Sequence, residues 1–130
     1  MKYLCLICAD SSAMMEFMSP ADTEKHFNEY REFTDSIRKS GQLVACNRLM
    51  PPATAITLRV RNGKVSTTDG PFAETKEHLG GYYLIEAKDQ QEAVQIASRI
   101  PGARFGSVEI RAVAEDTQTL EALGLAAVHA

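Results

Sequence analysis

The chain has 130 residues, 45% of them hydrophobic and 24% charged, a balance that is typical of one globular domain and excludes a disordered chain. The net charge is −3, from 14 basic and 17 acidic residues, and no basic face stands out, so direct binding to nucleic acid is not expected. The three cysteines have no disulfide-like spacing, which predicts a reducing compartment and hence a cytoplasmic protein. The apolar run after Lys2 ends at Asp10 and is too short for a signal peptide or a membrane span, so neither is expected.

The first part of the chain predicts a strand, a helix and a second strand. Residues 2–8 are apolar at nearly every position, which is typical of a strand with both faces buried. The segment Ser19-Pro20-Ala21-Asp22 combines a capping serine, a proline at the first helical position and an acid three residues after the cap, so a helix begins there and ends at Gly41. Residues 43–50 predict the second strand, before Pro51-Pro52. The apolar stripe of the helix is Phe27, Tyr30, Phe33 and Ile37.

The middle of the chain predicts a β-hairpin. Residues 55–60 and 64–68 flank Asn62-Gly63, a dipeptide that favours a two-residue turn because both central positions need positive φ. After a tight Asp-Gly-Pro-Phe turn, residues 73–79 predict one or two helical turns, which Gly80-Gly81 ends.

The last part predicts strand, helix, strand and a short terminal helix. Residues 82–87 form the strand, and Asp89 caps a helix that Pro101-Gly102 ends. Residues 108–113 form the final strand. The inner stripe of the second helix is Ala93, Ile96, Ala97 and Ile100, and the terminal helix contains Leu120, Leu123 and Val128.

The element order predicts an α+β fold of the ferredoxin-like split β-α-β type with an inserted hairpin. Two helices cover only one face of such a sheet, yet strands 4–8 and 82–85 carry apolar side chains on both faces. We therefore expect a homodimer with its sheets face to face, a dimeric α/β barrel. The alternative is that the C-terminal helix covers the open face of its own chain. The expected domain is 1–114, followed by a helical tail at 115–130.

Cysteine and histidine spacing gives little evidence of a metal site, and none is expected. Cys5 and Cys8 lie three apart on a strand and point to opposite faces, so they and Cys46 are interpreted as small apolar residues. The histidines are His26, His78 and His129, and no two of them have ligand spacing within one element.

The turn Asp69-Gly70-Pro71 is the strongest functional candidate. An aspartate held at a strand end by a rigid turn, with Glu74, Lys76 and Glu77 close behind it, has the groups needed for acid–base chemistry. Alternatively, Asp69 caps the turn and the other three form solvated local pairs. Phe72 is expected to anchor the turn in the core.

This segment resembles the signature of the DGPF-domain proteins of the YCII-related family. The matching residues are Asp69-Gly70-Pro71-Phe72-Ala73-Glu74-Thr75-Lys76-Glu77 and Leu79-Gly80-Gly81-Tyr82-Tyr83. Further matches are Met1-Lys2-Tyr3, Gly41, Leu49-Met50-Pro51, Ala93 and Glu109-Ile110-Arg111, so the resemblance covers about residues 1–114. It implies a dimeric α/β barrel.

The resemblance also implies two kinds of function. Some members are proposed to use a His–Asp pair in a cleft, and one branch removes chloride from a chlorinated aromatic ring. Asp69 matches the aspartate of that pair, but Tyr30 stands roughly where the histidine lies, and His26 is one turn earlier. Other members are linked to extracytoplasmic-function sigma factors, which implies an accessory or regulatory protein.

Two hypotheses follow. The first is a small-molecule-binding protein that could act as a metal-independent acid–base enzyme of the isomerase or lyase type and needs no cofactor. Its cleft would lie between the first helix, the sheet and the Asp69 turn. The second is a non-catalytic partner in a sigma-factor circuit. The candidate catalytic residues are Asp69, Tyr30 and His26, and the candidate substrate-binding residues are Arg48, Phe72, Glu74 and Lys76.

Overall fold

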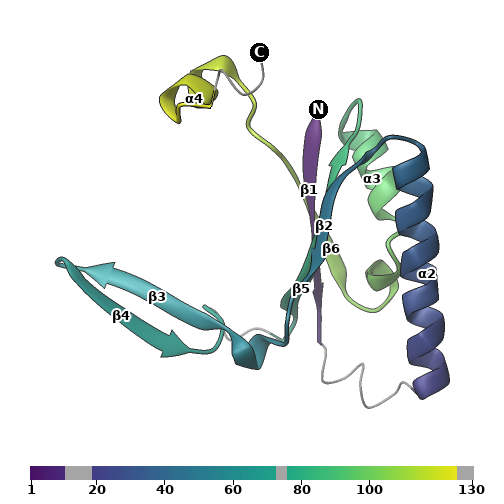
Figure 1. The fold of residues 1–130 in the computed structure, drawn as a ribbon, viewed down its shortest axis with the longest axis horizontal. Coiled ribbons are helices and arrows are strands. Elements are labelled where there is room, and N and C mark those ends of the chain that lie inside the picture. The colour runs from purple at the N-terminus through teal and green to yellow at the C-terminus, as the bar shows by residue number, and fades with distance from the viewer. Residues whose placement is uncertain (11–18, 73–75, 126–130) are drawn as a thin grey trace.

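A four-stranded antiparallel sheet forms the centre of the fold in the computed structural model, which describes residues 1–10, 19–72 and 76–125 (Figure 1). β1 (Lys2–Ala9) pairs with β5 (His78–Glu86) on one side and with β6 (Ser107–Ala112) on the other. β2 (Leu43–Arg48) adds to the far side of β5, so the strand order is β2-β5-β1-β6. β1 and β2 therefore run parallel with β5 between them. The predicted α+β class and order of the main elements are confirmed.

Helices cover one face of this sheet. α2 (Pro20–Lys39), α3 (Gln90–Ala97) and the short η2 (Pro101–Arg104) lie together on that face in Figure 1. The predicted start of α2 is confirmed, because Ser19 and Asp22 form a complete capping box. The core between sheet and helices contains Tyr3, Cys5, Phe33, Ile37, Tyr83, Ile85, Ala87, Ala93, Ile96, Ala97 and Ile100.

The opposite face of the sheet, called here the open face, carries no helix in Figure 1. Because side chains alternate along a strand, the residues next to buried Cys5 and Tyr83 point to this face. They are Leu4, Leu6, Tyr82 and Leu84, and all four are only partly buried. α4 (Thr117–Ala122) lies away from this face (Figure 1), so the terminal helix does not cover the sheet of its own chain.

A two-stranded hairpin, called here the arm, projects from the sheet (Figure 1). It consists of β3 (Ile56–Arg61) and β4 (Lys64–Asp69), and the turn η1 (Pro52–Thr54) connects it to β2. The predicted Asn62-Gly63 turn is confirmed, with φ of 53° and 74°. No helix in the described part of the chain is long and apolar enough to cross a bilayer.

Three local predictions around the Asp-Gly-Pro turn differ from the structure. Residues 73–75 lie outside the described part, but the expected helix does not extend to residue 79, because His78 and Leu79 already pair with Ala9 and Cys8 in the sheet. Gly80-Gly81 lies inside β5 and does not end an element. Phe72 does not anchor the turn in the core, since it is 78% exposed.

Candidate functional site

The Asp69 turn is tied to the base of the arm by two hydrogen bonds. Asp69 ends β4, and Gly70 follows with φ of 104°, a conformation that favours glycine. The Gly70 N–H donates to the Ala55 carbonyl at 2.7 Å, and the Thr57 hydroxyl donates to the Gly70 carbonyl at 2.8 Å. The turn is therefore held against the start of β3, as expected for a rigid element at a strand end.

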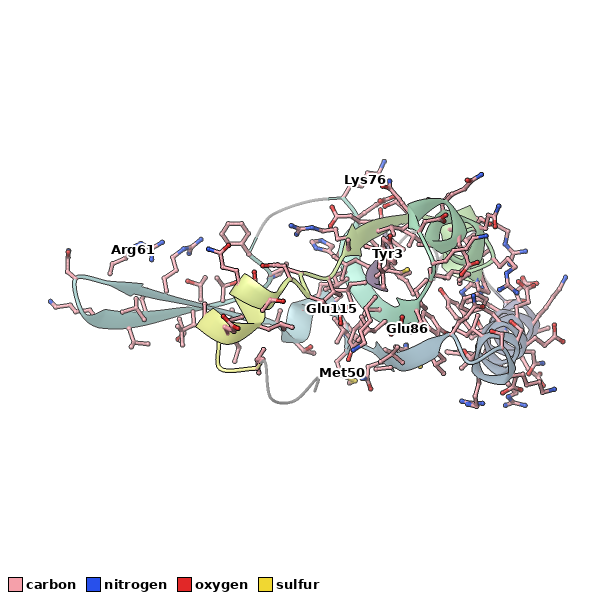
Figure 2. All side chains as sticks on the ribbon, turned by 90° about the horizontal axis from the view of Figure 1, so that it is seen from above. Tyr3, Met50, Arg61, Lys76, Glu86 and Glu115 are labelled. Atoms are coloured by element: carbon pink, nitrogen blue, oxygen red, sulfur yellow. The ribbon has the colours of Figure 1, made fainter. Side chains whose placement is uncertain are left out.

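A pocket of about 340 Å³ lies beside this turn, where the arm joins the sheet. We call it the junction pocket. Met50, labelled in Figure 2, lies on the connection that leads from β2 to the arm. The wall is almost entirely apolar, and three of its residues are prolines. The lining residues are Leu49, Met50, Pro51, Pro52, Thr54, Ala55, Pro71, His78 and Leu79.

His78 is the functional candidate that sequence reasoning missed. The sequence marks it only as a histidine without metal-ligand spacing, yet among the described residues of the pocket wall it is the titratable side chain. Its position results from the pairing of β5 with β1, in which His78 lies opposite Ala9. No local pattern signals this, because the two residues are distant in sequence. The two imidazole nitrogens can donate and accept hydrogen bonds, so His78 brings a polar group to an apolar wall.

Asp69 is not joined to Tyr30 or His26 by any contact among the described residues. Its backbone pairs with Ile56 on the arm, and its side chain is exposed. Tyr30 and His26 lie on α2, on the far side of the sheet from the arm (Figure 1). One chain therefore places the candidate aspartate beside the junction pocket and the other two candidates in the helical layer. A catalytic role for the three residues stays a prediction.

Tyr30 and His26 do lie together. Their rings are 5.0 Å apart and edge-to-face, and Phe105 lies 5.2 Å from the imidazole in the same manner. The Tyr30 hydroxyl accepts a hydrogen bond from the Gly102 N–H at 3.0 Å. Burial raises the pKa of this hydroxyl, although the hydrogen bond from Gly102 opposes the shift. Tyr30 is thus neutral at physiological pH and fixes η2 on α2.

Burial also acts on His26. It lowers the pKa of the imidazole, with Glu29 opposing the shift and Arg104 adding to it. The buried Nδ1 atom has no hydrogen-bond partner among the described residues. The ring is therefore neutral near pH 7 and packs as an aromatic group.

The candidate substrate-binding residues are spread over several surfaces. Arg48 ends β2, and its guanidinium lies 5.5 Å from the centre of the Phe27 ring on α2. Phe72 lies beside the arm, with the Arg59 guanidinium 5.5 Å from its ring centre. Lys76 is exposed and points outward in Figure 2, and Glu74 lies outside the described residues. Their roles in binding stay predictions. The described residues contain no group of three His, Cys, Asp or Glu side chains placed to hold a metal ion.

The chain is similar to known proteins over most of its length. Residues 1–117 match the family described as YCII-related domain. The chain is also similar to uncharacterized protein R00369 of Rhizobium meliloti (strain 1021), with 32% identity over 111 residues that cover 84% of this chain and 90% of the relative. The chain therefore belongs to the YCII-related family.

Proposed function

We propose that the protein binds a small, mainly apolar molecule in the junction pocket. The observation that supports this most is the composition of the wall, an apolar surface with a single described titratable group, His78. Small-molecule sites have this character, with hydrophobic walls and a few polar groups that fix orientation. A volume of about 340 Å³ suits a molecule of this size class.

The pocket is built to keep its shape. Pro51, Pro52 and Pro71 contribute fixed φ angles to the wall, and the two hydrogen bonds of Gly70 hold the turn on the arm. A pre-formed wall loses little conformational entropy when a ligand binds, which favours affinity. This rigidity supports a binding role for the Asp-Gly-Pro motif.

The chemistry available at the pocket is metal-independent proton transfer. His78 would accept a proton from a carbon of the ligand and return it to another carbon of the same molecule, which is an isomerase type of reaction. In the lyase type, the electron pair of the broken C–H bond would form a double bond as the neighbouring bond to a leaving group breaks, and His78 would pass the proton to that leaving group. Asp69, two residues before Pro71, would orient the polar end of the ligand or stabilise protonated His78. This role replaces the pairing of Asp69 with Tyr30 or His26, which one chain does not form.

The functional unit that we propose is a homodimer. The open face carries Leu4, Leu6, Tyr82 and Leu84, and the helices of the same chain leave them partly exposed. A second sheet packed on this face would bury them and give the dimeric α/β barrel. Sedimentation equilibrium of the purified protein tests this directly.

The binding proposal is tested by thermal shift with benzoate, cyclohexanecarboxylate and short-chain fatty acids as probes. A ligand that binds the folded state raises the melting temperature with concentration. Ala55→Leu fills the pocket and should abolish the shift. The matched control is Ala53→Leu, since Ala53 lies on the neighbouring η1 turn but does not line the pocket. An equal loss in both variants, or no shift with any probe, contradicts the proposal.

Two further substitutions separate binding from structure. Asp69→Asn and His78→Gln preserve size and most hydrogen bonding while removing a titratable group. We expect both variants to melt near the wild-type temperature, with ligand-induced shifts that are smaller than those of the wild type. Unfolding of Asp69→Asn in the absence of ligand would instead show that the turn is only structural.

The regulatory alternative, an accessory protein linked to an extracytoplasmic-function sigma factor, rests on the family resemblance. Co-purification with the sigma factor encoded nearest to this gene tests it. A stable complex combined with a failed ligand screen would favour this function over small-molecule binding.

A further inference from the structure

β6 is an edge strand of the sheet, and no strand in the described part of the chain lies on its outer side. The strand order is β2-β5-β1-β6, so β6 pairs with β1 alone among these residues. The outer edge of a strand presents N–H and C=O groups that a further strand can pair with. Natural edge strands often prevent such pairing with a proline or a β-bulge, and β6 has neither.

The opposite edge of the sheet is less suited to pairing with another strand. The ladder between β2 and β5 shifts its register between Leu43 and Ala45. A shift of this kind bends the edge strand and disrupts its ladder, which protects an edge. The regular edge of the sheet is therefore β6.

The pairing with β1 decides which backbone groups of β6 point outward. The Val113 N–H donates to the Lys2 carbonyl at 2.9 Å, so residue 113 and every second residue before it bond to β1. The residues between them direct their N–H and C=O groups to the outer edge, and they are Val108, Ile110 and Ala112. The side chains of Val108 and Ile110 pack against the helix-covered core.

The exposed side chains of β6 match a second copy of the same strand. Glu109 and Arg111 alternate with these core residues, so they lie on the open face, and neither forms an ion pair within the described part of the chain. In an antiparallel pair of two β6 strands centred on Ile110, Glu109 of each copy lies directly opposite Arg111 of the other. This is a non-hydrogen-bonded pair, in which opposite side chains approach most closely.

The same two charges exclude the neighbouring registers. A pairing centred on Glu109 would bring two glutamates together, and one centred on Arg111 would bring two arginines together. Like charges directly opposite each other destabilise a strand pair. The outer edge of β6 is therefore self-complementary in one register.

The helical layer adds an exposed apolar residue on the same side. α3 contacts β6 and β1, while α2 contacts β2, so the side of α3 away from α2 lies toward the β6 edge. Glu92 marks the side of α3 near α2, because it accepts a hydrogen bond from Gln42 in the turn between α2 and β2. Val94, two residues on and so on the opposite side of the helix, is 47% exposed.

We propose that two chains join along their β6 strands into one continuous antiparallel sheet. The outward backbone groups of β6 form the hydrogen bonds of the joint, and the reciprocal Glu109–Arg111 pairs fix its register. A two-fold axis through Ile110, perpendicular to the sheet, directs Val94 of each α3 toward the other copy. This interface is separate from the packing of two open faces, so it does not rest on the homodimer proposed above.

Charge reversal tests the register. Glu109→Arg or Arg111→Glu alone places like charges at both cross-strand pairs, and we expect the dissociation constant to rise about 3- to 30-fold at low salt. The double variant should restore association, and so should a mixture of the two single variants, because each pair joins two chains. Glu32→Arg, exposed on α2, is the matched control and should have no effect. Sedimentation equilibrium measures all five samples.

Two further variants identify the edge, because Glu109 and Arg111 also border the open face. Ala112→Pro removes an outward N–H and places its ring at the joint, yet it costs no hydrogen bond to β1. Val94→Asp places like charges between the two α3 helices and leaves both β6 and the open face unchanged. We expect each variant to weaken association, with melting temperatures of dilute samples showing that both are folded. Leu6→Glu, which charges the open face, should leave the edge contact intact.

The outcomes separate this inference from the packing of two open faces. If Leu6→Glu abolishes association while Ala112→Pro and Val94→Asp retain it, the pairing of edges is overturned and the homodimer proposed above stands. If Ala112→Pro and Val94→Asp weaken association while Leu6→Glu does not, the edge contact stands alone. A wild-type chain that stays monomeric at all concentrations overturns both, and leaves the β6 edge to an extended segment of another protein.

Discussion

The Tyr30 hydroxyl and Gly102 are in contact at close range. The hydroxyl oxygen accepts a hydrogen bond from the Gly102 N–H at 3.0 Å, and a Cβ on Gly102 would lie 2.5 Å from that oxygen and 3.0 Å from Ile7 Cγ2. The smallest residue is thus required where η2 meets both the sheet and the first helix.

The first prediction concerns Gly102→Ala. The added methyl group forces Tyr30 and Ile7 to move, and such overpacking should lower the free energy of unfolding by about 1–3 kcal/mol. Tyr30→Phe should cost about 1 kcal/mol, because it leaves the Gly102 N–H without its acceptor. Urea denaturation monitored by circular dichroism measures both.

The double variant provides the control for this contact. In Tyr30→Phe with Gly102→Ala, the hydroxyl that the new methyl group would meet is absent, so the combined loss should be smaller than the sum of the single losses. Strict additivity would contradict the close approach of these two groups.

The second prediction uses two adjacent glycines of β5. A Cβ on Gly81 would lie 2.9 Å from the Asn47 carbonyl oxygen, whereas a Cβ on Gly80 would meet nothing closer than the Ile7 carbonyl oxygen at 3.9 Å. Gly81→Ala should therefore destabilise the pairing of β5 with β2 by about 1–3 kcal/mol. Gly80→Ala should stay within about 0.5 kcal/mol of the wild type. Equal effects in thermal unfolding would contradict the difference in packing.

Local signals predicted a large part of the fold. The capping box at Ser19, the Asn62-Gly63 turn and the inner stripe of α3 depend on residues within one or two turns of each other, and each is confirmed. The residues carry these signals before any tertiary contact forms, because caps and tight turns satisfy backbone groups locally. The order of these elements along the chain predicted the α+β class, which the structure confirms.

Features that depend on distant contacts were not predicted. The helix expected over 73–79 is wrong at its end, because pairing of His78 with Ala9 outweighs local helical preference. Phe72 has an aromatic ring suited to the core, yet it lies beside Arg59 on the arm. The junction pocket lies where β2, the arm and β5 meet, so the sequence of no single segment predicts it.

The third prediction concerns pH and His26. Burial lowers the pKa of His26 in the folded state, while the unfolded chain has the ordinary value of about 6.5. At pH values well above 6.5 the His26 imidazole is neutral in both the folded and the unfolded state, so its protonation does not change the free energy of unfolding. As pH falls further, the unfolded state binds a proton first, so the free energy of unfolding decreases until the folded pKa is passed.

His26→Phe isolates this contribution. Phenylalanine keeps an aromatic ring beside Tyr30 and Phe105 but has no titratable group. Urea unfolding at pH 7.5 and pH 5.5 should show a smaller loss of stability on acidification in the variant than in the wild type. An identical loss in both proteins would assign the pH dependence to other groups, and a larger loss in the variant would reverse the sign argued for His26.

The fourth prediction concerns the turn that closes the junction pocket. Gly70 has φ of 104°, and a Cβ there would meet nothing within 4 Å, so Gly70→Ala brings backbone strain without a steric clash. The strain should cost about 1–3 kcal/mol or push the turn into another conformation. Thr57→Val removes the hydrogen bond from the Thr57 hydroxyl to the Gly70 carbonyl while keeping the shape of the side chain.

Both variants should reduce ligand-induced thermal shifts more than they reduce the stability of the sheet, because the turn forms one wall of the pocket and lies outside the helix-covered core. The far-UV spectrum and the cooperativity of unfolding should therefore stay close to those of the wild type. Gly80→Ala is the matched glycine control and should leave binding unchanged. If Gly70→Ala bound the same probes with unaltered affinity, the rigid turn would have no part in shaping the site.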